Sequence, residues 1–180
     1  MRAIALKLLI IFIVFNYANT YQALQKPEAK SHKLTATSLE RKTYAKKKLT
    51  QAQIVAKFFK GYNSNLHLFA DSFVDTARRY NIDYTVLPSI AMVESSGCKN
   101  YILETNNCFG WGNGLIYFKS IDDAIDAVGS ALGTGKTYKR YQDERSIAVF
   151  AKIYNPSNWQ DYQAKINYFR EEVIKYEKSD

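Results

Sequence analysis

Apolar residues recur every three or four positions in several stretches of this chain, a spacing typical of helices that pack one face against a core. No repeat and no alternation of strands with helices accompanies this pattern. We therefore expect a mainly α single domain with at most a small β-hairpin. Helices are predicted at about residues 65–80, 87–95, 121–132, 144–153 and 159–177, with a short strand at 115–118 and a polar loop at 133–143.

One of these predicted helices carries a carboxylate on its apolar face. Glu94 follows Leu87 and Ile90 by seven and four positions, so in a helix it shares their side. Desolvation there, the negative end of the helix and the scarcity of nearby basic residues would all raise its pKa. A carboxyl group that stays protonated near neutral pH can act as a general acid. The alternative is an ordinary glutamate that is solvated or paired with Lys99.

The chain begins with a segment that resembles a targeting sequence. Within residues 1–25, Arg2 and Lys7 precede an apolar run and then small and polar residues, which is the layout of a signal peptide or an N-terminal anchor. A buried N-terminal helix is the alternative. Residues 26–60 are basic and contain few large apolar residues, which predicts a flexible linker before a folded domain at 61–180. We expect an exported protein of the periplasm, the cell envelope or the extracellular space.

The net charge of +8 is distributed unevenly along the 180 residues. Residues 61–180 carry thirteen basic and fifteen acidic groups, whereas residues 26–60 carry ten basic and two acidic groups. Nucleic-acid binders usually place positive charge on the folded surface, so we expect no nucleic-acid partner. The basic linker could contact an anionic membrane surface or wall polymer, or its charge could simply keep it solvated.

Cys98 and Cys108 are the only two cysteines in the chain. In an exported protein we expect them to form a disulfide that pins the segment directly after Glu94. Two free thiols or part of a metal site are the alternatives. The only histidines, His32 and His67, lie in no cysteine-rich motif, so we expect no metal site.

An irregular glycine-rich stretch follows, and aromatic residues lie within it and further along the chain. Aromatic rings beside asparagine suit the flat faces and polar substituents of sugars. We interpret Phe109 mainly as a core residue and Trp111, which lies between two glycines, mainly as a ligand contact. Tyr154 could fill the core or hydrogen-bond a substrate. Asn107 and Asn113 could reach the hydroxyl or acetamido groups of a bound sugar.

Five motifs resemble, in order and spacing, the bacterial glucosaminidase family of the lysozyme-like superfamily across about residues 65–176. They are Glu94-Ser95-Ser96-Gly97, Asn107-Cys108-Phe109-Gly110-Trp111-Gly112, Phe118-Lys119-Ser120, Tyr154-Asn155-Pro156 and Tyr162-Gln163-Ala164-Lys165-Ile166. The resemblance implies a lysozyme-like α fold that cleaves β-1,4 bonds in the glycan strands of peptidoglycan. It implies that Glu94 is the general acid. It also implies that Asn107, Phe109, Gly110 and Tyr154 line the sugar cleft.

The chain departs from that family in one respect. Many members carry a second acidic residue on a hairpin lobe, and here Glu104 is the nearest candidate second carboxylate. Hydrolysis and the lytic transglycosylase reaction therefore both stay open. We expect a monomeric enzyme without a cofactor, because acid catalysis on an acetal needs only a proton donor. The alternatives are a glycan-binding module without turnover and an envelope adaptor that docks a partner.

Overall fold

The computed structural model of the protein describes residues 48–178. Within this range the chain forms seven α-helices and no strand, which confirms the mainly α prediction. The predicted signal segment and residues 26–47 of the predicted linker lie outside the described range. The α-helices are α2 (Gln51–Gly61), α3 (Ala70–Arg79), α4 (Val86–Ser95), α5 (Ile121–Thr134), α6 (Lys139–Glu144), α7 (Ile147–Tyr154) and α8 (Trp159–Lys178), and the short 3-10 helices are η1 (Asn65–Phe69), η2 (Leu103–Thr105), η3 (Lys136–Tyr138) and η4 (Pro156–Asn158).

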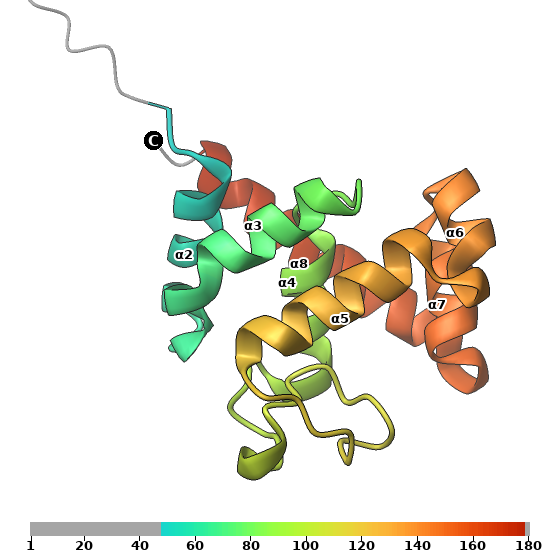
Figure 1. Ribbon diagram of the computed structural model, residues 1–180. Helices are drawn as coiled ribbons and strands as arrows, with labels where there is room; N and C mark the ends of the chain where they lie inside the picture. The colour runs from blue at the N-terminus through green and yellow to red at the C-terminus, as the bar shows by residue number, and fades with distance from the viewer. Residues whose placement is uncertain (1–47, 179–180) are drawn as a thin grey trace, which may run out of the picture. The chain divides into compact units, whose positions relative to one another are not determined.

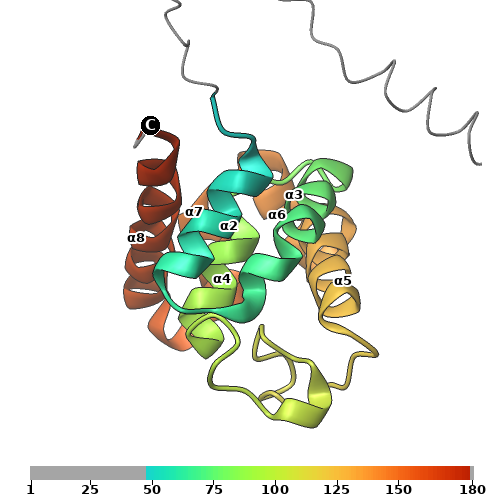
Figure 2. The same ribbon diagram turned by 90° about the vertical axis from the view of Figure 1, so that its left-hand side faces the viewer.

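Helix α4 lies at the centre of the domain and contacts α8, α3 and α5 (Figure 1 and Figure 2). Most of its residues are buried, as expected for an apolar helix surrounded by others. The Asp83 carboxylate accepts hydrogen bonds from the Thr85 N–H and hydroxyl just before the helix, and Pro88 lies in the first turn, where its missing N–H is not needed. Ser96 ends the helix in the left-handed conformation. The start and end of this helix agree with the prediction.

Helix α2 corrects the predicted boundary between linker and domain. Residues 51–60 are helical, and Ile54, Val55, Phe58 and Phe59 are buried in the core. A capping box at Thr50 starts the helix. The flexible-linker prediction is therefore wrong for this stretch. The composition of residues 26–60 as a whole gave no sign of this helix, because its few apolar residues follow a long basic sequence.

Three further segments differ from the prediction. The stretch 65–80 is divided into η1 and α3 instead of one helix. Residues 133–143 contain the end of α5, η3 and most of α6 instead of a loop, because the buried ring of Tyr141 anchors this polar segment to the core. The predicted strand at 115–118 is absent, and the Phe118 N–H makes a single backbone hydrogen bond to Thr105. Among residues 48–178, no helix is both long and apolar enough to cross a bilayer.

The loops between α4 and α5 gather at one end of the domain, away from residue 48 (Figure 1 and Figure 2). They hold most of the residues that the sequence predicted for the functional site. The helices therefore act as a scaffold, and α4 carries Glu94 to the end where these loops lie.

Candidate active site

The segment after α4 is fixed by a disulfide and by one buried hydroxyl. Cys98 and Cys108 are bonded to each other, which confirms the predicted pairing. The Ser95 hydroxyl accepts a hydrogen bond from the Cys98 N–H and lies 2.8 Å from the Cys108 carbonyl oxygen, to which it can donate. Ser96, Gly97 and Cys98 all have positive φ, so the chain reverses direction within three residues. These contacts hold the following loop beside the end of α4.

Asn107 organises the second half of this loop. Its side-chain nitrogen donates to the carbonyl oxygens of Trp111 and Ile116 at 2.7 and 3.1 Å, and its side-chain oxygen accepts from the Trp111 N–H at 3.1 Å. Buried polar groups of this kind usually have a structural role once their hydrogen bonds are satisfied. Asn107 lines the cavity described below, but its amide is used to shape the loop.

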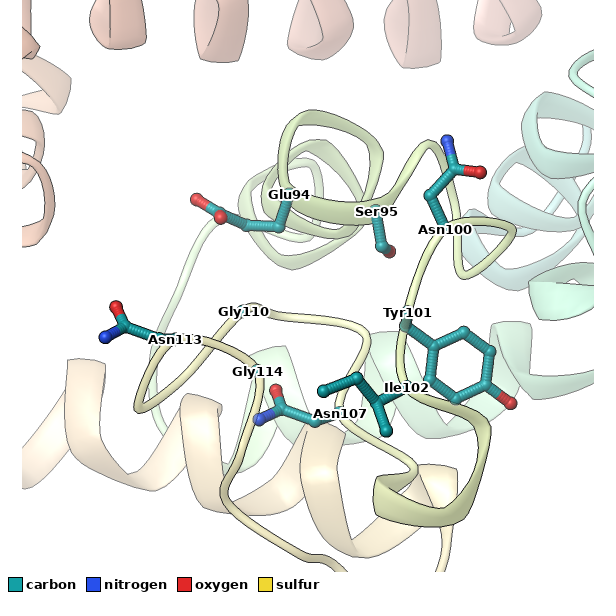
Figure 3. Close-up of a pocket in the computed structure, with 9 residues that line it drawn as sticks. All are labelled: Glu94, Ser95, Asn100, Tyr101, Ile102, Asn107, Gly110, Asn113 and Gly114. Atoms are coloured by element: carbon teal, nitrogen blue, oxygen red, sulfur yellow. The ribbon is translucent and has the colours of Figure 1, made fainter.

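A cavity of about 530 Å³ opens beside Glu94 (Figure 3). The end of α4, with Glu94 and Ser95, lies across from the loop that carries Gly110, Asn113 and Gly114 (Figure 3). A smaller cavity of about 260 Å³ shares Gly110 and Asn113 with the first, so the two adjoin. We call the two cavities together the groove. Its remaining lining residues are Asn100, Tyr101, Ile102 and Asn107 in the larger cavity and Trp111, Gly112, Tyr138 and Tyr154 in the smaller one.

Glu94 is half-buried at the wall of the groove. The Tyr162 hydroxyl donates a hydrogen bond of 2.6 Å to its Oε1. Burial raises the pKa of Glu94 above its ordinary value of 4.5, and the hydrogen bond from Tyr162 offsets part of this increase. Within residues 48–178 Glu94 forms no ion pair, and Lys99 donates to the Tyr62 carbonyl oxygen at 3.0 Å. The alternative of a solvated or Lys99-paired glutamate is therefore wrong.

Gly110 approaches the second oxygen of the same carboxylate. A Cβ atom at this position would lie 2.7 Å from Glu94 Oε2, and the φ of Gly110 is +70°. The backbone conformation therefore favours glycine, and a side chain here would force the Glu94 carboxylate to move. Tyr162 donates to Oε1, and Oε2 lies on the side of Gly110, which lines the groove together with Glu94.

Two tyrosines form the wall behind Glu94. The rings of Tyr154 and Tyr162 stack with their centroids 5.5 Å apart, and the Tyr154 hydroxyl donates to the Phe109 carbonyl oxygen at 2.8 Å. Burial raises the pKa of both phenols, and the nearby Glu94 charge raises it further. Both therefore stay neutral hydrogen-bond donors near neutral pH. The sequence motif that begins with Tyr162 gives no sign of the contact with Glu94, although a buried tyrosine hydroxyl usually needs a polar partner.

The other predicted site residues separate into two groups. Trp111 is half-buried and lines the smaller cavity, as does Tyr154. Phe109 is fully buried against Phe73, which agrees with its interpretation mainly as a core residue. Glu104 is exposed on η2 and lines neither cavity. Glu94 is the one carboxylate that lines the groove within the described part of the chain.

No group of three or more histidine, cysteine, aspartate or glutamate side chains in residues 48–178 is placed to hold a metal ion. Comparisons of the chain with protein-family models, with curated proteins and with solved structures find no match. The residues of the groove and the order of the sequence motifs are therefore the features that indicate a function. Its central element is a half-buried carboxyl group with a raised pKa at the wall of an open groove.

Proposed function

We propose that the protein is a peptidoglycan glycosidase that cleaves β-1,4 bonds of the glycan strand, with Glu94 as the general acid. The observation that carries the proposal is the Glu94 carboxyl group, whose pKa is raised by burial and whose Oε2 lies beside Gly110 at the wall of the groove. The motif order that resembles the bacterial glucosaminidase family supports the same substrate and a lysozyme-like fold. Asparagines and aromatic rings along the groove suit a sugar polymer.

The acid step follows from the two different environments of the carboxyl oxygens. The proton resides on Oε2 and passes to the glycosidic oxygen, so that the bond from this oxygen to the anomeric carbon breaks. Negative charge then develops on the Glu94 carboxylate. Tyr162 already donates to Oε1 and stabilises this charge without any rearrangement.

The absence of a second carboxylate from the groove favours the lytic transglycosylase route. Inverting and retaining glycosidases usually place a second carboxylate beside the sugar, to activate water or to attack the anomeric carbon. Here Glu94 is the one carboxylate in the described groove. In the proposed route the C6 hydroxyl of the sugar attacks its own anomeric carbon and returns its proton to Glu94. The product carries a 1,6-anhydro end, no water is consumed, and the acid is restored.

The direct test is the release of soluble material from dye-labelled cell walls by the full chain. Glu94→Gln should lower the rate by about 10²- to 10⁴-fold, the usual contribution of a general acid. Gln keeps an acceptor for Tyr162, so circular dichroism should show an unchanged fold. Glu104→Gln is the matched control and should retain the parent rate.

Two outcomes would overturn the proposal. Equal release by Glu94→Gln would show that Glu94 is not the acid. A folded parent that binds walls but releases nothing would identify the groove as a glycan-binding site without turnover.

A further inference from the structure

A separate cavity of about 450 Å³ opens at the other end of α4 from Glu94. It lies where Val86, the first residue of α4, meets side chains of α6, α7 and α8. Glu94 is eight positions further along the helix, which corresponds to about 12 Å of helical rise. The cavity shares no lining residue with the groove, and the proposed reaction does not use it.

The walls of this cavity combine apolar and basic groups. Ile82, Val86 and Ile147 contribute side chains that are nearly buried, and Tyr141 adds a buried ring. Asn81, Asp83 and two arginines complete the lining: Arg145 directly follows α6, and Arg170, on α8, pairs with the Asp83 carboxylate. The apolar surfaces can cover a small aliphatic group, while the guanidinium groups attract an anion.

The Arg170 side chain makes hydrogen bonds that stabilise the fold. Its Nε donates to the Thr85 hydroxyl at 2.9 Å, and its Nη2 donates to the Asp83 carboxylate at 3.1 Å. This edge of the guanidinium is therefore occupied, and the charge of Arg170 is balanced by Asp83. Arg170 connects α8 to the start of α4, and its Nε–Nη2 edge is not available to a ligand.

Arg145 is in a different situation. Arg145 is exposed, and its Nη1 donates to the Asn81 carbonyl oxygen at 2.7 Å, where both residues line the cavity. Within residues 48–178 no carboxylate pairs with Arg145, and its Nε and Nη2 have no hydrogen-bond partner. Nε and Nη2 form the edge of a guanidinium that binds a carboxylate through two parallel hydrogen bonds.

We propose that this cavity binds a carboxylate that is carried on a small aliphatic group, such as the C-terminal end of a short peptide. Arg145 receives the carboxylate through Nε and Nη2, and the aliphatic part rests against Ile82, Val86 and Ile147. The apolar walls favour this ligand over a bare inorganic anion. The site is independent of the glycosidase proposal, because it lies outside the groove.

The test is a calorimetric titration of the full chain with N-acetylalanine. N-acetylalanine should bind saturably, whereas the neutral N-acetylalaninamide should not, and inorganic phosphate should bind more weakly. Arg145→Gln should weaken N-acetylalanine binding at least tenfold. Arg140→Gln is the matched control, because Arg140 lies in α6, which Arg145 directly follows, but pairs with Glu144 at the surface.

A second variant separates binding from folding, because Arg145 also contacts Asn81. Arg145→Lys keeps the charge and can still donate to the Asn81 carbonyl oxygen, but it lacks the two parallel N–H donors that bind both oxygens of a carboxylate. We expect its thermal unfolding to match that of the parent while most of the affinity is lost. The proposal is overturned if the parent does not bind N-acetylalanine, if the amide or phosphate binds as tightly, or if either Arg145 variant binds like the parent.

Discussion

The two oxygens of the Glu94 carboxyl group have different neighbours, and this difference defines the chemistry proposed for the protein. Oε1 receives the Tyr162 hydroxyl, and Oε2 lies beside Gly110 at the groove. Burial keeps the group protonated to a higher pH than an exposed glutamate. In the proposed reaction, Glu94 thus supplies the proton, and the position of Oε2 decides where this proton is transferred.

Tyr162→Phe removes the hydrogen bond to the carboxylate while keeping the ring. This hydrogen bond lowers the pKa of Glu94, so its loss should raise that pKa and move the alkaline limb of the pH–rate profile to higher pH. The maximal rate should fall by about tenfold or more, because the carboxylate formed in the acid step loses a donor. Tyr168→Phe, on an exposed part of α8, is the control. An unchanged alkaline limb in Tyr162→Phe would show that the hydrogen bond does not act on the catalytic group.

Gly110→Ala and Gly114→Ala form a matched pair in the same loop. Both glycines have positive φ, so both substitutions should cost about 1 kcal/mol of stability. Only the new Cβ at Gly110 would collide with Glu94 Oε2, whereas at Gly114 the nearest atom is 3.9 Å away. Wall degradation should therefore fall at least tenfold in Gly110→Ala and clearly less in Gly114→Ala, which lines the groove but does not meet the carboxylate. Equal activity of the two variants would contradict the proposed geometry.

Single residues of this site could be predicted to different degrees from the sequence. Glu94 was found because its helical face is a local property of the chain. Its partner Tyr162 lies 68 positions away, and no local pattern pairs two residues across that separation. Asn107 shows the reverse case, because its amide, a group that suits sugar binding, is used here to shape the loop.

At the scale of elements, the sequence predicted long periodic helices well and short or polar ones poorly. The central helix α4 agrees with its predicted limits because Pro88 and Ser96 mark its two ends. Helix α6 has mostly polar residues, and its single buried anchor, Tyr141, gives no periodic pattern. The expected strand at 115–118 lacks a partner strand, and a strand alone has no ladder of hydrogen bonds to stabilise it.

Reduction of the Cys98–Cys108 disulfide tests how the loop after α4 is held. The bond closes a loop of ten residues, so its loss should lower the free energy of unfolding by about 3 kcal/mol. Wall degradation should fall as well, because this loop presents Gly110 and Trp111 to the groove. Denaturant unfolding with and without a reductant measures the effect, and a Cys98→Ala, Cys108→Ala variant should not respond to the reductant. Equal stability of the oxidised and reduced parent would contradict a constraining role.

At the scale of the whole molecule, the folded domain begins earlier than its composition suggests. A fragment of residues 61–180 should not fold, because it lacks Ile54, Val55, Phe58 and Phe59. Each of these buried side chains contributes about 1.5–3 kcal/mol, and their sum is comparable to the stability of a typical domain, about 5–15 kcal/mol. A fragment of residues 48–180 should unfold cooperatively, as measured by circular dichroism. A folded 61–180 fragment would show that α2 is dispensable.

The reaction proposed for the whole molecule needs a single carboxyl group, Glu94, which protonates a glycosidic bond of a glycan strand bound in the groove. The most direct measurement is mass spectrometry of the fragments that the full chain and its Glu94→Gln variant release from purified peptidoglycan. The account predicts fragments with 1,6-anhydro ends from the parent and none from the variant. Reducing ends would contradict the single-carboxylate route, and identical fragments from parent and variant would contradict the role of Glu94 itself.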